Sequence, residues 1–110
     1  PHRPLTPAAK RVTVELSTGD VLFEQGATSD YIYVVREGEV EIVRTPPGGS
    51  HERLAVEGPG HYFGEMGPLF QLPRSATVRA TAPTLLDGYS VDAFRDEFGL
   101  ERLEGLVTRR

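Results

Sequence analysis

The chain has 110 residues, a net charge of −4 and no cysteine. This length fits one domain with a modest core, and the acidic balance gives no overall basic field for nucleic acid. The lack of cysteine excludes a disulfide framework and thiolate metal ligands. The sequence shows no apolar run of 18 residues and no signal peptide, so we expect no membrane binding through this segment. Because of the acidic balance, we also expect no nucleic-acid binding through it.

The chain opens on a proline-rich stretch and then alternates short apolar segments with glycine-containing turns. Residues 1–10 contain three prolines and no apolar periodicity, which predicts a tail or linker. The chain does not begin with Met, so we expect it to be a fragment of a longer protein. Period-two and continuous apolar runs predict strands over 11–16, 21–24, 31–35, 38–44, 51–56, 75–81 and 84–89. Short strands at this spacing are typical of a barrel or jelly roll.

The periodicity changes after residue 89 from that of strands to that of helices. Ser90 can cap a helix whose apolar face carries Val91, Phe94 and Phe98, and Gly99 can end it. A second apolar stripe follows at Leu100, Leu103, Leu106 and Val107. We therefore expect a β-roll over about 11–89, C-terminal helices over about 90–108, and one domain over 11–110.

Residues 63–80 (FGEMGPLFQLPRSATVRA) hold the residues best suited to bind a phosphate. Gly64 and Gly67 lack a Cβ, so the backbone N–H groups of a short helix can approach an anion closely. Pro68 fits the first turn of such a helix, where a missing N–H costs little. The segment therefore indicates a backbone cradle for a compact anion.

Three side chains in the same segment would complete a site for a phosphate joined to a sugar. Arg74 can donate two parallel hydrogen bonds to phosphate oxygens, which a lysine cannot. Glu65 suits a hydroxyl donor rather than a phosphate, and Ser75 adds a small hydroxyl beside the arginine.

The segment resembles the phosphate-binding cassette of the cyclic-nucleotide-binding domain family. That family includes the catabolite activator protein, regulatory subunits of cAMP-dependent protein kinase, and cyclic-nucleotide-gated channels. The matching motifs are Phe-Gly-Glu at 63–65 and Pro-Arg-Ser-Ala-Thr-Val at 73–78. A second block agrees, with Gly-Asp-Val-Leu-Phe at 19–23 and glycine-bracketed apolar residues at 32–35. The resemblance covers about residues 11–98.

The resemblance implies a mainly β fold, an eight-stranded β-roll or jelly-roll barrel with a short cassette helix and short C-terminal helices. It implies that Arg74 pairs with the cyclic phosphate and that Glu65 binds the ribose 2′-OH. The implied ligand-binding residues are Gly64, Glu65, Met66, Gly67, Arg74, Ser75 and Ala76. The implied ligand is cAMP, with cGMP as the alternative, because a hydroxyl residue after the arginine favours cGMP in some branches.

The implied role is that of a cytoplasmic sensor that is not an enzyme and needs no cofactor or metal. Its signal would pass to an output domain covalently attached outside this chain. Two departures from the family bear on that signal. Pro68 replaces an aliphatic residue, and the long helix before the barrel is missing while the helix after it is short.

Three other interpretations compete with this one. Glu65 and Arg74 could form only a surface ion pair, and the domain could be a degenerate relative used for interaction alone. A cupin-like metal enzyme would use His51, His61 and Glu65, but the sequence has no His-x-His pair to supply closely spaced ligands. Tyr31, Tyr33 and Phe63 are expected in the core rather than against a ligand, and the three histidines are expected to be solvent-facing or hydrogen-bonded.

Overall fold

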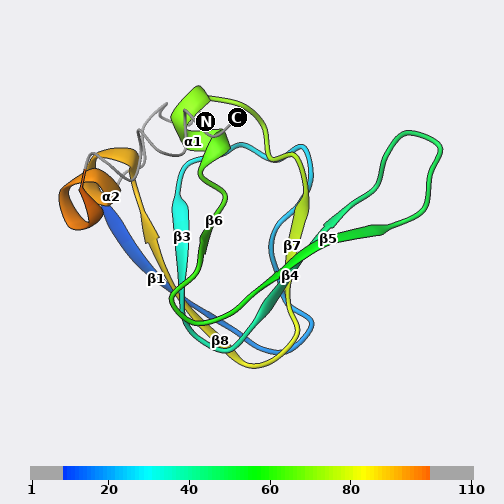
Figure 1. Ribbon diagram of the computed structural model, residues 1–110, viewed down its shortest axis with the longest axis horizontal. Coiled ribbons are helices and arrows are strands. Elements are labelled where there is room, and N and C mark those ends of the chain that lie inside the picture. Colours follow the sequence, from blue (N-terminus) through cyan, green and yellow to red (C-terminus); the bar gives the residue numbers. More distant parts are fainter. Residues whose placement is uncertain (1–8, 100–110) are drawn as a thin grey trace.

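The computed structural model describes residues 9–99, which form two antiparallel sheets and two short helices. The strands are β1 (Arg11–Leu16), β2 (Val21–Phe23), β3 (Ile32–Glu37), β4 (Val40–Arg44), β5 (Glu52–Glu57), β6 (Tyr62–Phe63), β7 (Thr77–Ala80) and β8 (Thr84–Tyr89). One sheet has the order β1-β8-β3-β6 and the other β2-β7-β4-β5 (Figure 1). The predicted eight-stranded roll is confirmed.

The core lies between the sheets and follows the period-two pattern of the strands. Alternate residues point inward, so one face of each strand is apolar. The inner cluster consists of Tyr33, Val35, Val40, Phe63, Val78 and Leu86, which are all at most 7% exposed. As predicted, Tyr33 and Phe63 are core residues, and their rings stack with centroids 5.8 Å apart.

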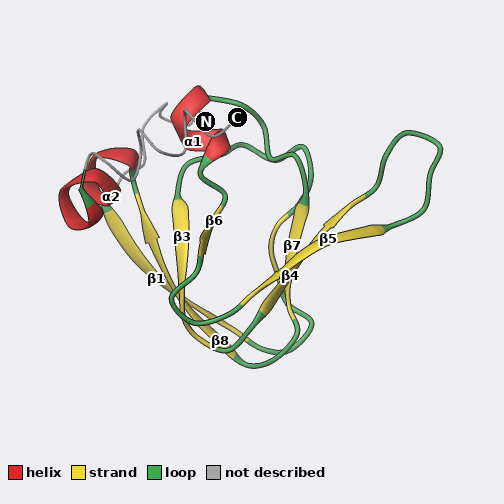
Figure 2. Ribbon diagram, in the orientation of Figure 1, coloured by secondary structure: helices red, strands yellow, loops and turns green. Residues whose placement is uncertain are grey.

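The two helices are α1 (Met66–Phe70) and α2 (Val91–Phe98), and both lie toward the same end of the sheets (Figure 2). The Ala93 backbone N–H donates to the Ser90 hydroxyl at 3.1 Å, so the predicted N-cap is confirmed. Gly99 ends α2 with a φ of 91°. The predicted apolar stripe over 100–107 lies outside the described residues, so the second C-terminal helix stays a prediction.

An aromatic cluster fixes α2 on the outer face of the β1-β8-β3-β6 sheet. Phe94 is fully buried there, and its ring centroid lies 5.4 Å from that of Tyr62 and 6.2 Å from that of Tyr89. Leu69 of α1 packs against the same cluster. The cassette helix and α2 therefore share one apolar contact surface. Within the described residues, no helix combines the length and the apolar character needed to cross a membrane.

Several strand bounds differ from the sequence predictions by one or two residues, and two differences lie next to the cassette. The two-residue strand β6 was not predicted, because a segment this short carries no periodicity. Strand β7 begins at Thr77 rather than at residue 75. Just before this strand, the Arg74 backbone pairs with the β2–β3 loop: Arg74 N–H donates to the Ala27 carbonyl at 2.8 Å, and Gly26 N–H donates to the Arg74 carbonyl at 2.7 Å.

Candidate functional site

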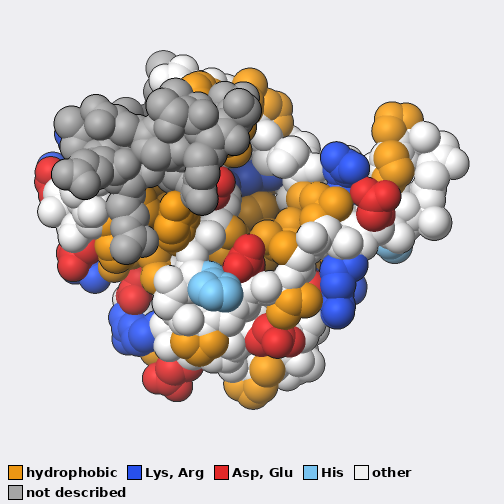
Figure 3. Space-filling view, viewed as in Figure 1, with side chains coloured by type: hydrophobic (Ala, Val, Ile, Leu, Met, Phe, Trp, Pro, Cys, Tyr) orange, Lys and Arg blue, Asp and Glu red, His pale blue; other side chains and the backbone are white. Residues whose placement is uncertain are grey.

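A pocket of about 760 Å³ opens between α1, the segment before β7, and the inner faces of β4 and β5. This volume lies within the usual range for small-molecule sites. All seven residues predicted to bind a ligand line it: Gly64, Glu65, Met66, Gly67, Arg74, Ser75 and Ala76. Figure 3 shows this face, where hydrophobic side chains surround a hollow with charged groups at its edges. The structure therefore brings the whole predicted set to one place.

Arg74 is the most tightly held side chain of the site. It is 4% exposed, and its Nη1 and Nη2 groups donate to the carbonyls of Gly64 and Tyr31, each at 2.7 Å. Its guanidinium carbon lies 4.0 Å from the centroid of the Phe23 ring. Two strong hydrogen bonds and a cation–π contact thus fix the plane of the guanidinium before any ligand arrives.

The Arg74 guanidinium also has unused donors. Burial lowers the pKa of Arg74 to about 10, while the nearby Tyr33 and Glu65 act to raise it, so the group stays charged at neutral pH. Its Nε atom is buried and has no hydrogen-bond partner within residues 9–99. Because buried polar groups are almost always satisfied, an unpaired N–H on a cation that belongs to the pocket lining suits an anionic ligand.

The two cassette glycines are required by contacts within the protein. Gly64 has a φ of +75°, and a Cβ built there would lie 2.7 Å from Arg74 Nη1. A Cβ at Gly67 would lie 2.0 Å from the Ser29 hydroxyl, which donates to the Leu72 carbonyl at 2.7 Å. The sequence prediction attributed both glycines to close approach of a ligand. The structure gives a further reason, because Arg74 and the β2–β3 loop occupy the space that side chains would need.

Glu65 occupies the N-cap position of α1 without capping it by its side chain. The half-buried carboxylate lines the same pocket as Arg74 and is therefore available to a ligand hydroxyl. The interpretation of Glu65 and Arg74 as a surface ion pair is wrong, because Arg74 is buried and donates to backbone carbonyls. Pro68 lies in the first turn of α1, as predicted.

The proposed metal ligands are not assembled. His51 Nδ1 lies 2.7 Å from the Thr45 hydroxyl at the base of the β4–β5 hairpin, whereas His61 Nδ1 lies 2.9 Å from Glu57 Oε1. Residues 9–99 contain no group of three His, Cys, Asp or Glu side chains able to hold a metal ion. The cupin-like alternative therefore lacks its ligand set in the described part of the chain.

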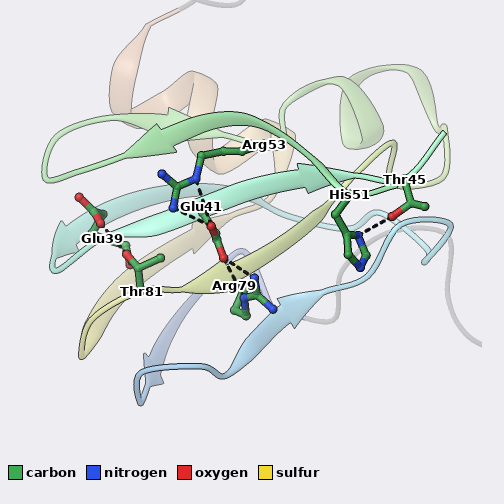
Figure 4. A network of polar contacts seen from close by, with 7 residues as sticks. All are labelled: Glu39, Glu41, Thr45, His51, Arg53, Arg79 and Thr81. Carbon is green, nitrogen blue, oxygen red and sulfur yellow. Dashed lines mark hydrogen bonds and ion pairs between the residues drawn. The ribbon is translucent and has the colours of Figure 1, made fainter. Parts of the chain in front are cut away.

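The sheet that carries the pocket has a charged network on its other side that sequence reasoning missed (Figure 4). Glu41 is 8% exposed and accepts hydrogen bonds from Arg53, at 2.8 and 3.1 Å, and from Arg79. Hydrogen bonds from Arg53 and then from Arg79 lower the pKa of the Glu41 carboxyl. None of the three residues lines the pocket, so we assign the network to joining β4, β5 and β7.

Several residues that line the pocket or hold Arg74 in place were also missed as site residues. Phe23 lies under the guanidinium, although the sequence marked it only as part of an apolar strand. The Tyr31 carbonyl holds Arg74, and a backbone group carries no sequence signal of its own. Other lining residues are Ile42, Leu54, Glu57, Gly60, His61, Tyr62, Phe63, Leu72, Pro73 and Val78. Among these, the inward positions of Ile42, Glu57 and Val78 could be found only once the register of the strands was known.

Comparison with known proteins decides the family. The family model described as cyclic nucleotide-binding domain matches residues 13–98. The chain belongs to this family. The domain is 53% identical over 98 residues to an uncharacterized ABC transporter ATP-binding protein of Mycobacterium tuberculosis, covering 89% of this chain and 30% of that protein.

Two further likenesses extend the comparison. The domain is 36% identical over 93 residues to a cAMP-dependent protein kinase regulatory subunit of Yarrowia lipolytica, covering 84% of this chain and 22% of that protein. Among solved structures, the Thermus thermophilus catabolite activator protein is 31% identical with a TM-score of 0.82, covering 92% of this chain and 50% of that one. The chain thus spans less than a third of the two curated relatives.

Proposed function

We propose that the domain binds a cyclic nucleotide reversibly in this pocket and that cAMP is the preferred ligand. The observation that carries the proposal is the buried Arg74 guanidinium, fixed by two carbonyls and with an unpaired Nε, in a pocket of ligand size. A single positive charge held in this way suits the single negative charge of a cyclic phosphodiester. The family match supports the same ligand class.

Each lining residue then has a defined role. Arg74 binds the cyclic phosphate, and the Glu65 carboxylate accepts a hydrogen bond from the ribose 2′-OH. Gly64, Gly67 and Ala76 are small and leave room for the sugar and the phosphate. Ser75 places a hydroxyl beside the phosphate, and Met66 lines the site with an apolar side chain. The apolar side chains of Ile42 and Leu54, which line the pocket from β4 and β5, offer a surface for the base.

The choice of cAMP rests on two observations. The Yarrowia relative is named as cAMP-dependent, and Ile42 and Leu54 offer the base an apolar contact. Ser75 alone does not decide the base. The pocket carries out no catalysis in this proposal, because it serves to hold and release the nucleotide.

The domain would act as a cytoplasmic sensor for an output part outside this chain. It spans 30% of the mycobacterial relative, which is named an ABC transporter ATP-binding protein. That name supports a transporter ATPase as the output. Binding would shift the balance between two arrangements of the C-terminal segment by no more than the difference in ligand affinity between them.

Calorimetry of the domain against cAMP, cGMP and 5′-AMP tests the proposal. We expect saturable 1:1 binding of cAMP, weaker binding of cGMP and the weakest binding of 5′-AMP. Tighter binding of cGMP would reverse the choice of base, and no binding of either cyclic nucleotide would refute the function.

A further inference from the structure

The charges that line the pocket are unbalanced. Four of the lining residues carry a carboxylate, imidazole or guanidinium group: Glu57, His61, Glu65 and Arg74. With the histidine neutral, one guanidinium faces two carboxylates. The proposed function assigns Glu65 and Arg74 to the ligand and leaves Glu57 and His61 without a role.

Glu57 is directed inward by its strand and is held in place. It is the last residue of β5 and pairs in register with Val40 of β4, which is fully buried and faces the core. Its side chain is 22% exposed, whereas that of its partner His61 is 63% exposed. His61 Nδ1 lies 2.9 Å from Glu57 Oε1 and 3.4 Å from the Gly58 backbone nitrogen.

A tight turn fixes the histidine that holds Glu57. The His61 backbone N–H donates to the Gly58 carbonyl at 3.0 Å, and the Gly60 N–H donates to the Val35 carbonyl at 2.8 Å. The turn thus ties the end of β5 to β3. Glu57 therefore presents a positioned negative charge to the pocket rather than a freely moving one.

We propose that Glu57 is a specificity-determining residue that disfavours nucleotides more negative than a cyclic phosphodiester. The proposal rests on the proposed function. A cyclic nucleotide has one negative charge, which Arg74 matches. A 5′-phosphomonoester has about −1.5 to −2 at neutral pH, and its additional charge would face carboxylates that cannot donate a hydrogen bond to it.

The test compares affinities for cAMP and 5′-AMP in the parent domain and in Glu57→Gln. Both are measured by competition at about pH 8, where the monoester is largely dianionic, and at low ionic strength, where screening is weakest. We expect Glu57→Gln to improve 5′-AMP binding about three- to tenfold more than cAMP binding. That is the size expected for one elementary charge several ångströms away in a partly solvated site.

Two matched variants separate this role from others. Glu52→Gln removes the same charge from the same strand, but Glu52 pairs with Arg44 and does not line the pocket. It should leave the ratio of the two affinities unchanged. Glu57→Asp keeps the charge and should keep most of the discrimination even if it loosens the turn.

The outcomes distinguish the two proposals. If the parent binds cAMP but Glu57→Gln changes both affinities by the same factor, Glu57 is structural only and this inference is wrong. If Glu52→Gln changes the ratio as much as Glu57→Gln, the effect is one of net charge and the inference is also wrong. If the parent binds no cyclic nucleotide, the proposed function fails first.

Discussion

Replacing Arg74 by leucine should weaken cAMP binding far more than it destabilises the fold. The change removes the proposed charge partner of the phosphate, and a hydrogen bond to a charged group contributes about 1.5–3 kcal/mol. At about 1.4 kcal/mol per tenfold change, this corresponds to a loss of affinity of about 10- to 100-fold. Arg74→Lys should lie between parent and leucine, because it keeps the charge but loses the Nε–H and the planar guanidinium that the two carbonyls hold.

The effect of this variant on stability has two opposing parts. Leucine leaves the carbonyls of Gly64 and Tyr31 without their side-chain donor, which costs free energy. It also removes a buried cation whose desolvation lowers the pKa of Arg74. Because these parts oppose each other, we expect the change in folding free energy to be smaller than the change in binding free energy.

Calorimetry and thermal unfolding of the same preparations would measure both quantities. Arg44→Leu is the matched control, since Arg44 pairs with Glu52 outside the pocket and its loss should leave cAMP affinity unchanged. A folded Arg74→Leu that binds cAMP as well as the parent would refute the assignment of Arg74 to the phosphate.

Three more predictions concern the ribose, the outer network and the helices. Glu65→Ala should weaken cAMP but hardly affect 2′-deoxy-cAMP, and the four affinities should give a coupling of about 0.5–3 kcal/mol; zero coupling would make Glu65 structural. The lowered pKa of Glu41 means that its ion pairs stabilise the fold above the unfolded pKa and are lost as pH falls through the lower folded value. Denaturant unfolding from pH 6 to pH 3 should therefore show a smaller loss of stability in Glu41→Gln than in the parent, and parallel curves would contradict this. Binding of cAMP should slow amide exchange in 64–78 and in α2, with little change over 32–44; protection confined to 64–78 would show that α2 does not report the ligand.

The sequence predicted the parts of the fold that depend on local pattern. The alternation in Arg11–Leu16 and the cap at Ser90 both reflect local backbone chemistry, and both elements form where expected. Strand β6 was not predicted, because its two residues form a strand only by pairing with β3, about 30 residues away in the sequence. Strand β7 begins at Thr77, and the Arg74 backbone before it pairs with the β2–β3 loop, a contact that no local pattern predicts.

The residues of the candidate site could be predicted from the sequence, but the groups that hold the Arg74 guanidinium in place could not. Glu65 and Arg74 line the same pocket, as expected from their spacing in the sequence. The ring of Phe23 and the carbonyl of Tyr31, which orient the guanidinium, come from segments more than 40 residues earlier. Such contacts depend on how the two sheets face each other, and no local pattern encodes them. The inward direction of Glu57 likewise follows from its register with β4.

In the proposed complex, the buried, unpaired Nε–H of Arg74 donates to the phosphate of the cyclic nucleotide. Nuclear magnetic resonance of the arginine side-chain Nε–H groups during a cAMP titration tests it most directly, with the Arg74→Lys variant identifying the resonance. We expect the Arg74 signal to move to higher proton frequency and to exchange more slowly with water as cAMP saturates the site. A signal that stays unchanged while cAMP binds would show that the Arg74 Nε–H does not donate to the phosphate.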